Sequence, residues 1–231
     1  MEYLPNGYTL ETVPGSFPFG TDSMVLSHFI RLPKQAKVLD LGSGCGTLGL
    51  LLCATDPHCT VTGLEIDPTA HDAALENIRR NNAHSRLKSL CTDLRDFPAD
   101  LTPGSFDVCV SNPPYFSGGP ASRSTPIARR DDCCRPEELF TAAARALKYG
   151  GDFYLVQKPE KLAQLIACGA AVKLEAKRLR LVRHKEGGPI TTILLQLRKG
   201  GKPGLIMDEL CLFDSLGNPT AQYREIYHTG D

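Results

Sequence analysis

The sequence predicts an α/β fold with a doubly wound, mostly parallel sheet of seven strands, the last of them antiparallel. A buried strand at residues 37–41 leads directly into a glycine-rich turn and an apolar helix, which is how such a sheet begins. Further short apolar runs and helical stretches then alternate along the chain. A length of 231 residues with 42% apolar residues supports one large domain of this class or two small ones.

The first 20 residues are rich in proline and glycine and are expected to be mostly loop. A polar trio at residues 21–23 precedes an apolar stretch and is typical of a helix N-cap region. No linker or low-complexity tract divides the chain. We therefore expect a single domain, 1–231, with an N-terminal extension at residues 1–36.

Hydrophobic patterning gives the order βα, βα, β, β, αβ, αβ, β, which predicts the mostly parallel sheet with its last strand antiparallel. Glycines mark element ends, and Gly150-Gly151 is expected to end the helix before the fifth strand. The strands are expected at residues 37–41, 60–64, 87–91, 106–111, 153–156, 176–182 and 191–197. The helices are expected at residues 24–30, 47–54, 68–82, 136–149 and 159–168.

The turn after the first strand contains three glycines in a Gly-x-Gly-x-Gly pattern. Gly42 and Gly44 remove side chains that would keep a ligand from the backbone, and Gly46 lets the helix start close to the strand. Dinucleotide sites use Gly-x-Gly-x-x-Gly instead, so the spacing argues against a bound pyrophosphate.

Acidic residues follow the second and third strands. Glu65 lies 19 residues after Gly46, where an acid can take two ribose hydroxyls; the alternative is that it caps the next helix. Asp93 follows the third strand, whose end lies beside the bound base in this layout. Its carboxylate could therefore accept from an adenine amine.

Asn112-Pro113-Pro114-Tyr115 comes directly after the fourth strand. Two prolines cannot donate ladder hydrogen bonds, so the strand stops, and Pro113 keeps Asn112 extended. Such a turn can present a side-chain carbonyl, a backbone carbonyl and an aromatic face to one ligand. The exocyclic amine of a planar ring needs two acceptors and a stacking partner, which fits; the alternative is a rigid loop.

The segment 116–135 is rich in glycine, proline and arginine and has no apolar period. A loop this long in a compact domain is usually a functional lid or a disordered segment. We expect it to be a lid on the substrate side.

Net charge is zero, so any surface that binds nucleic acid must be local. Between residues 173 and 202 there are nine Lys or Arg against two Glu. Arg178 and Arg180 alternate with apolar residues, as Arg198 does, and they are expected to share one exposed sheet face. A phosphate-binding patch and a solvated strand face remain alternative interpretations.

The nine cysteines lack zinc spacing, and most are scattered singly through apolar segments, as buried thiols are in a reducing compartment. A catalytic thiol is the alternative. No run approaches the ~18 apolar residues of a membrane span, and the N-terminus lacks signal-peptide features. We expect a cytoplasmic protein without a membrane segment or a metal.

Residues 38–46, the acid at 65 and Asn-Pro-Pro-Tyr together resemble the class I S-adenosylmethionine-dependent methyltransferases, which have a Rossmann-like fold. Asn-Pro-Pro-Tyr is the amino-methylating version, shared by adenine-N6 and glutamine-N5 enzymes. Residues 19–26 are similar to the bacterial tRNA1(Val) adenine37-N6 methyltransferases, and residues 198–203 and 212–227 to their Gram-positive branch. The lid departs from them, with Ala128-Arg129-Arg130-Asp131 where relatives read Ala-Arg-His-Glu.

The resemblance implies S-adenosylmethionine as cofactor and methylation of adenine N6 in RNA, most of all tRNA, by an enzyme expected to be a monomer. Asn112 and Pro113 would accept from the target amine, and Tyr115 would stack on the flipped base. The donor would contact residues of the glycine turn, the strand ends and the first helix: Asp40, Gly42, Gly44 and Gly46 at its methionine portion, Glu65 at its ribose, Asp93 and Leu94 at its adenine, with Thr21 and Asp22 closing over it. RNA contacts are expected at Arg129, Arg130, Lys177, Arg178, Arg180, Arg183 and Lys185.

Other readings stay open. Glutamine-N5 enzymes carry a sizeable helical domain before the glycine turn, whereas 36 residues precede Lys37 here. Guanine-N2 enzymes of large RNAs usually have a duplicated N-terminal half. A small-molecule methyltransferase could use the long lid, and an RNA-binding protein could have kept the fold without catalysis.

Overall fold

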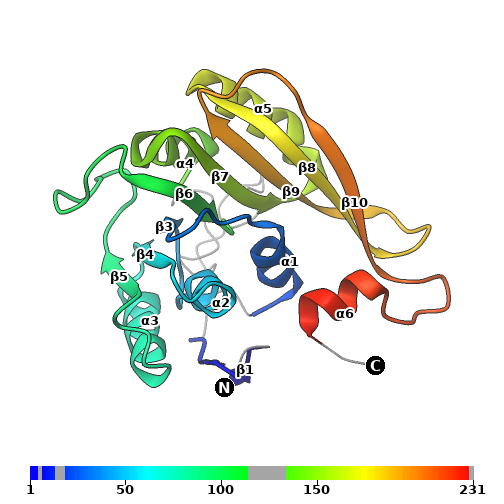
Figure 1. Cartoon of the computed structure of the whole chain (residues 1–231), viewed down its shortest axis with the longest axis horizontal. Helices are drawn as coiled ribbons and strands as arrows, with labels where there is room; N and C mark the ends of the chain where they lie inside the picture. Colours follow the sequence, from blue (N-terminus) through cyan, green and yellow to red (C-terminus); the bar gives the residue numbers. More distant parts are fainter. Residues whose placement is uncertain (5–6, 14–18, 114–133, 229–231) are drawn as a thin grey trace, which may run out of the picture.

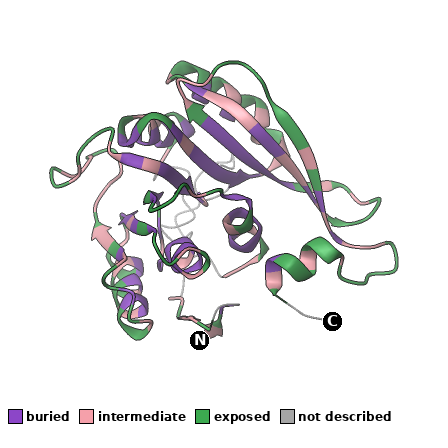
Figure 2. Cartoon of the chain, viewed as in Figure 1, coloured by how far each residue is buried: buried purple, intermediate pink, exposed green. Residues whose placement is uncertain are grey.

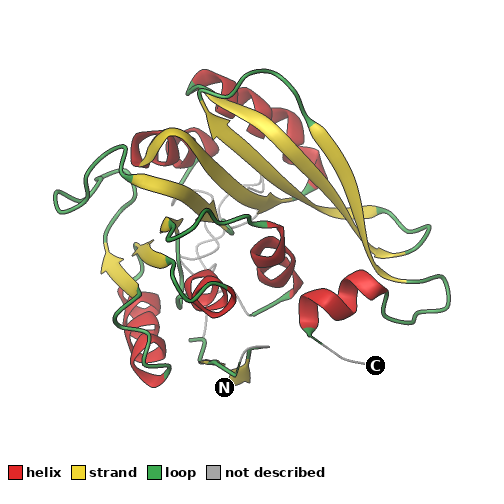
Figure 3. Ribbon diagram, in the orientation of Figure 1, coloured by secondary structure: helices red, strands yellow, loops and turns green. Residues whose placement is uncertain are grey.

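An eight-stranded sheet forms the centre of the protein (Figures 1 and 3). The computed structural model describes residues 1–4, 7–13, 19–113 and 134–228. The strand order is β10-β8-β9-β7-β6-β3-β4-β5, and a separate antiparallel pair joins β1 (Glu2–Tyr3) to β2 (Thr9–Leu10). The strands of the large sheet are β3 (Lys37–Leu41), β4 (Thr60–Glu65), β5 (Leu87–Cys91), β6 (Phe106–Ser111), β7 (Leu147–Gln157), β8 (Leu174–Lys185), β9 (Ile190–Lys199) and β10 (Ile206–Phe213).

All seven predicted strands are present, and the seventh, β9, is antiparallel to both of its neighbours, β7 and β8. The prediction of seven strands is nevertheless wrong, because β10 adds an eighth strand parallel to β8 at the sheet edge. Charged residues interrupt the apolar pattern of β10, and one of them, Asp208, pairs with Arg180 of β8. An edge strand needs only one apolar face, so its sequence signal is weak.

Helices cover both faces of the sheet (Figures 1 and 2). One apolar cluster joins the sheet to the first three helices, and a second joins it to α4 and α5. Along β7, Tyr154 belongs to the first cluster and Phe153 to the second, so this strand is buried on both faces. The helices are α1 (Thr21–Phe29), α2 (Thr47–Thr55), α3 (Pro68–Arg80), α4 (Pro136–Ala146), α5 (Leu162–Ala171) after the 3-10 turn η3 (Pro159–Lys161), and α6 (Ala221–Tyr227).

The prediction that Gly150-Gly151 ends a helix is wrong, because α4 ends at Ala146 and both glycines lie within β7. Gly150 has φ +83°, and a side chain at Gly151 would meet the carbonyl oxygen of Asp107 at 2.9 Å. The pairing of β6 with β7 shifts register here. Gly150 therefore permits the irregular backbone of the strand at this point, and Gly151 permits the close approach of the β6 backbone.

Two terminal segments fasten onto this core. The backbone N–H of Thr9 donates to Asn81 Oδ1 at 2.8 Å, which ties β2 to the end of α3. At the other end of the chain, α6 packs against α1. A row of neighbouring rings connects β8 and β10 to α6, with centroid spacings of 4.9, 5.0 and 4.3 Å: His184, Phe213, Tyr223 and Tyr227. The local pattern of residues 221–227 predicts neither a helix nor a strand, so α6 was not expected.

Within the described residues no helix is long and apolar enough to cross a membrane. The eight cysteines in the described part of the chain are all free thiols, as predicted. Five of them are buried, but Cys91 is exposed at the end of β5, contrary to the expectation for a small buried hydrophobe.

Gly63 provides a test of how the sheet supports the glycine turn. A Cβ at this position would lie 2.5 Å from Ser43 Oγ and 2.7 Å from Ser43 Cβ. We expect Gly63→Ala to lower the free energy of unfolding by ~1–3 kcal/mol through overpacking, as measured by urea denaturation. Ser43→Gly removes both clashing atoms, so the double variant should recover part of the loss. If the changes in unfolding free energy of the two single variants simply added in the double variant, the contact between positions 63 and 43 would be contradicted.

Candidate functional site

The predicted site residues meet at the carboxyl edge of four neighbouring parallel strands. Leu41 of β3 pairs with Leu64 of β4, and Glu65 pairs with Cys91 of β5. On the other side, β6 pairs with β3 as far as Asp40, opposite Val110. The residues after each strand therefore line one edge, which is where ligands bind in open α/β sheets.

The glycine turn forms an open cradle at this edge. Gly42 and Gly44 have φ of +73° and +53°, and a Cβ at either position would have nothing within 4 Å. The backbone N–H groups of Gly42 and Ser43 both donate to the carbonyl of Leu64, at 2.9 and 3.0 Å, which holds the turn against β4. Gly46, with φ +83°, is the N-cap of α2.

Asp40 lies beneath this cradle as a buried carboxyl group. It is 1% exposed, and neither of its oxygens has a hydrogen-bond partner among the residues that the structure describes. Burial, and then the nearby Glu65, raise the pKa of Asp40 to about 8. Buried carboxylates are normally paired, so this group fits a cationic ligand that enters through the cradle.

Glu65 closes the other side of the cradle. Its Oε2 accepts from the backbone N–H of Gly44 at 2.7 Å, and its Oε1 accepts from that of Asp67 at 2.8 Å. Burial raises the pKa of Glu65, while these two hydrogen bonds oppose the shift. Each oxygen keeps a further lone pair, so the carboxylate can still accept from ligand hydroxyls. Capping of α3 falls instead to Asp67, whose side chain accepts from Thr69 N–H.

Asn112 has a defined amide orientation. Its Nδ2 donates to Ser23 Oγ of α1 at 3.0 Å, so Oδ1 is left as the acceptor that the amide offers. The strand end beneath it is fixed because Ser111 Oγ donates to the carbonyl of Leu41 at 2.7 Å. Pro113 is buried, and the other two residues of the motif, Pro114 and Tyr115, lie outside the described residues.

Sequence reasoning missed the role of Ser23. The polar trio of residues 21–23 was expected to precede the helix, but Gly20 is the N-cap and α1 begins at Thr21. Ser23 is therefore a buried residue of the first turn. A serine at a helix start is ordinarily a cap, so local sequence contains no signal for a contact with a residue 89 positions away.

Thr21 and Asp22 lie in the same first turn. Asp22 Oδ1 accepts from Thr192 Oγ1 of β9 at 3.3 Å, and burial raises the pKa of Asp22 although Lys158 opposes it. The side chains of Thr21 and Tyr227 are hydrogen-bonded to each other. Contacts with β9 and α6 thus hold the start of α1 in its place beside Asn112. Neither the contact with Thr192 nor that with Tyr227 was predicted.

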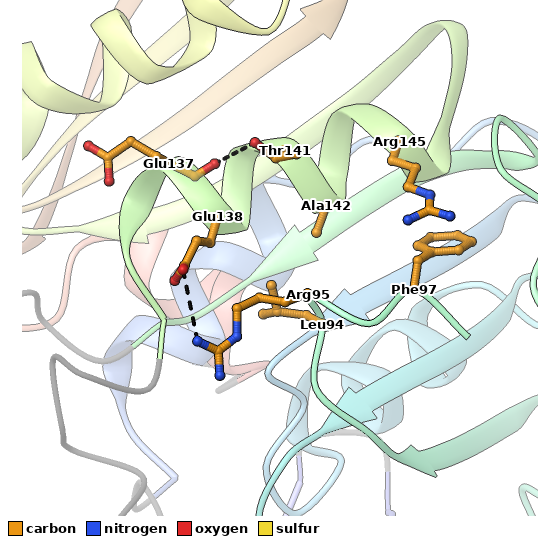
Figure 4. Close-up of a pocket in the computed structure, with 8 residues that line it drawn as sticks. All are labelled: Leu94, Arg95, Phe97, Glu137, Glu138, Thr141, Ala142 and Arg145. Atoms are coloured by element: carbon orange, nitrogen blue, oxygen red, sulfur yellow. Dashed lines mark hydrogen bonds and ion pairs between the residues drawn. The ribbon is translucent and has the colours of Figure 1, made fainter. Parts of the chain in front are cut away.

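Asp93 and Leu94 lie after β5 as predicted, but the Asp93 carboxylate is already paired. Both of its oxygens accept from Arg95, at distances of 2.5 to 2.9 Å, and this contact lowers the pKa of Asp93. Leu94 lines a cavity of about 370 Å³ between this loop and α4 (Figure 4). Arg145 lies 4.8 Å above the Phe97 ring at one end of it.

The predicted RNA-binding arginines of β8 do share a face, but the expectation that this face is exposed is wrong. Arg178 is 9% exposed and lies 4.4 Å from the centroid of the Phe29 ring, which Arg180 also covers at 5.5 Å. Arg180 forms a bidentate pair with Asp208 at 2.6 and 2.7 Å. The apolar face of α1 and the eighth strand cover these side chains. The local pattern predicts that helix but not its packing on β8, and it does not predict the eighth strand.

The remaining predicted RNA contacts differ in their surroundings. Arg183 pairs with Glu209, and Lys177 Nζ donates to the carbonyl of Lys202 at 2.9 Å. Lys185 is exposed at the end of β8. Arg129 and Arg130 lie outside the described residues, as does most of the predicted lid. Among the described residues no group of three or more His, Cys, Asp or Glu could hold a metal ion.

The raised pKa of Asp40 predicts that the stability of the protein depends on pH. Its pKa is raised on folding, so the folded state holds this proton more tightly than the unfolded chain, and the wild type loses stability as pH rises from about 4 through about 8. Asparagine cannot titrate. We expect Asp40→Asn to stabilise the ligand-free protein by an amount that grows between pH 5 and pH 8, at up to ~1.4 kcal/mol per pH unit.

Urea denaturation of both proteins across this pH range measures the difference. Calorimetry with S-adenosylhomocysteine adds a second readout, because the variant should bind this ammonium-bearing ligand more weakly even though it is more stable. A stability difference that is the same at every pH would contradict the assignment.

Comparison with known proteins agrees with this geometry. Residues 17–173 match the model of the methyltransferase small domain family. A Bacteroides fragilis protein is 33% identical over 174 residues, covering 74% of this chain and 72% of the relative. A Tolumonas auensis protein is 32% identical over 197 residues (84% and 81%), and a Photobacterium profundum protein 29% identical over 208 residues (88% and 86%). All three are named tRNA1(Val) (adenine(37)-N6)-methyltransferase.

Solved structures show the same fold. A predicted O-methyltransferase of Agrobacterium tumefaciens superposes with a TM-score of 0.75 at 20% identity, covering 90% of this chain and 96% of that one. Geranyl diphosphate C-methyltransferase of Streptomyces coelicolor, in complex with S-adenosyl-L-homocysteine, gives a TM-score of 0.55 at 12% identity, covering 77% and 78%. The cradle, the buried acids and the matching family model together show that the chain belongs to the methyltransferase small domain family.

Proposed function

We propose that this protein transfers a methyl group from S-adenosylmethionine to N6 of an adenine in tRNA, at position 37 of tRNA1(Val) as in the names of its relatives. The observation that carries the proposal is the orientation of Asn112. Its Nδ2 is engaged by Ser23, so its Oδ1 is the acceptor presented beside the glycine cradle. An amide oxygen placed there suits an amine as methyl acceptor.

The donor site consists of groups with complementary chemistry. Asp40 provides an unpaired buried carboxyl group for the ammonium of the methionine portion, and the backbone at Gly42 and Gly44 gives the ligand room to approach. Glu65 can accept from the ribose hydroxyls in addition to its backbone partners. For adenine to reach the Asp93 carboxylate, it must share that group with Arg95.

A base amine is a poor nucleophile because its lone pair is delocalised into the ring. Asn112 Oδ1 and the carbonyl of Pro113 would accept its two hydrogens and draw the nitrogen towards tetrahedral geometry. The bound donor supplies an electrophilic methyl group on its sulfonium. The protein contributes alignment and stabilisation of the positive charge that arrives on nitrogen.

The remaining roles extend the same proposal. Tyr115 would stack on the extruded base and replace stacking worth ~1–3 kcal/mol. Arg129 and Arg130, together with Lys177 and Lys185, would contact RNA phosphates, and Arg178, Arg180 and Arg183 would add positive field from their paired positions. A monomer in the cytoplasm remains the expectation, which analytical ultracentrifugation and cell fractionation test.

The activity test is incubation of the protein with labelled S-adenosylmethionine and total bacterial tRNA, followed by nucleoside analysis. N6-methyladenosine is the expected product. Label in glutamine of an added protein fraction, or in another nucleoside, would overturn the proposed specificity.

Asn112→Ala tests the catalytic corner. The variant loses the side-chain acceptor, so we expect the single-turnover methylation rate to fall by ~10²-fold or more. Binding of S-adenosylhomocysteine should persist, because Asp40 and the glycine turn are unchanged. Calorimetry and rapid-quench kinetics measure the two quantities. Full methylation by this variant would refute the role of Asn112.

Ser23→Ala tests how the amide is held. Without the hydroxyl, Asn112 Nδ2 loses its partner and the amide is free to turn, so we expect kcat to fall by roughly 10-fold while the KM for the donor stays unchanged. Ser27→Ala is the matched control, since Ser27 lies in the same helix and donates to the carbonyl of Met24. Equal losses in both variants would mean that α1 is merely destabilised.

A further inference from the structure

A second cavity lies on the α1 side of the sheet, away from the carboxyl edge. Its volume is about 670 Å³, and it extends from the loop after α1 across the first half of β7 to β9, β8 and β10. Register places Tyr154, Gln196, Arg178 and Ile206 side by side in one row over these four strands. The sheet itself is therefore the floor of the cavity.

Positive charge is in excess around this cavity. Five cationic and two acidic side chains line it: Arg31, Lys148, Lys177, Arg178 and Arg198 against Asp107 and Asp152. Both acids are already paired, Asp107 with Lys148 at 2.8 Å and Asp152 with Arg198 at 2.8 Å. Burial and the neighbouring Arg31 lower the pKa of Arg178, as expected where cations crowd. The cavity therefore carries a surplus of positive charge, which favours an anionic ligand.

A strand irregularity brings two of these cations together. The pairing of β8 with β9 shifts register between Ala176 and Arg178, so Lys177 is not placed by simple alternation. Consecutive residues of a regular strand point to opposite faces, but here Lys177 and Arg178 both line the cavity. The bulge therefore concentrates charge at this point.

Gln196 gives the floor an unused hydrogen-bond acceptor. The residue is 5% exposed, and its Oε1 has no partner among the described residues. A buried amide oxygen left unsatisfied costs ~1–3 kcal/mol. A ligand that donates an N–H or O–H into the cavity would remove that cost.

Tyr149 adds an aromatic surface at the rim. Tyr149 is 83% exposed, and its hydroxyl donates to the carbonyl of Gly200 at 3.2 Å. Its ring lies over that glycine, where a Cβ would be 2.2 Å from the ring and would force it to move. Exposed, preorganised aromatic rings are stacking platforms for unpaired bases.

We propose that this cavity binds a nucleotide of the substrate RNA at a distance from the methylated base, with its phosphate at Arg31 and Lys177, in the positive field of Arg178, and its base on Tyr149. Gln196 Oε1 would accept from a hydroxyl or amino group of that nucleotide. Asp107, which lines the cavity, is five residue steps along β6 from Asn112, roughly 17 Å at ~3.3 Å per residue. The contact therefore adds affinity for RNA without touching the reacting atoms, and it rests on RNA being the substrate.

The first test compares two charge-matched double variants. Arg31→Gln with Lys177→Gln removes two cavity cations; Lys88→Gln with Arg79→Gln removes two cations from β5 and α3 at the other edge of the sheet. We expect the cavity variant to bind full-length tRNA roughly 10-fold more weakly and to lower the salt slope of the affinity by about 2, with binding of S-adenosylhomocysteine unchanged. Equal losses in both double variants would overturn the proposal.

Gln196→Leu separates binding from folding. Replacing an unsatisfied buried acceptor by an apolar side chain should leave the free energy of unfolding unchanged or raise it, whereas tRNA affinity should fall. Unchanged tRNA affinity would overturn the proposal. A mononucleotide that binds the cavity without displacing tRNA would also do so, since the occupant would then be a free nucleotide.

Failure of this inference differs from failure of the proposed function. If the wild type methylates tRNA and the cavity variants do so with the same KM for tRNA, the remote contact is wrong and the enzyme assignment stands. If tRNA binding depends on the cavity but no methyl group is transferred, the cavity assignment stands and the activity is wrong.

Discussion

A buried carboxyl group that has no hydrogen-bond partner among the described residues is the constraint on which the site depends. Asp40 is almost inaccessible to solvent, and its ionisation is opposed by burial and by Glu65. Such a group weakens the free protein as pH rises, and it becomes favourable when a cation lies beside it. The backbone at Gly42 and Gly44 is open, with nothing within 4 Å of a Cβ at either position. A cationic group of the proposed donor, bound beside Asp40, would remove a cost that the free protein carries.

The acceptor side of the site depends on α1. This helix joins the sheet through the T-shaped contact of Phe29 with Tyr154 and through Thr192, and it joins α6 through Tyr227. With its start held in this way, the Ser23 hydroxyl can select one orientation of the Asn112 amide. The C-terminal helix therefore supports the corner at Asn112 without forming part of it.

Zero net charge does not prevent local binding of an anion. Arg180 and Arg183 of β8 pair with acids of β10, whereas Arg31 and Lys177 line the cavity beside Arg178 and give it a surplus of positive charge. An RNA substrate, as proposed above, would bring phosphates to this surplus of charge and unpaired bases to the exposed ring of Tyr149.

The sequence alone determined the doubly wound sheet, the glycine turn and the positions of Asp40, Glu65, Asp93 and Asn112, because these depend on local patterns at strand ends. Tertiary structure decided the rest. Ser23 contacts Asn112, and β10 pairs with β8, only once distant segments pack together. Gly150-Gly151 has the local appearance of a helix stop, but close approach to β6 makes it part of a strand. Contacts between remote side chains leave no periodic trace in the chain, which is why the local pattern predicts the glycine turn and does not predict the contact that orients the Asn112 amide.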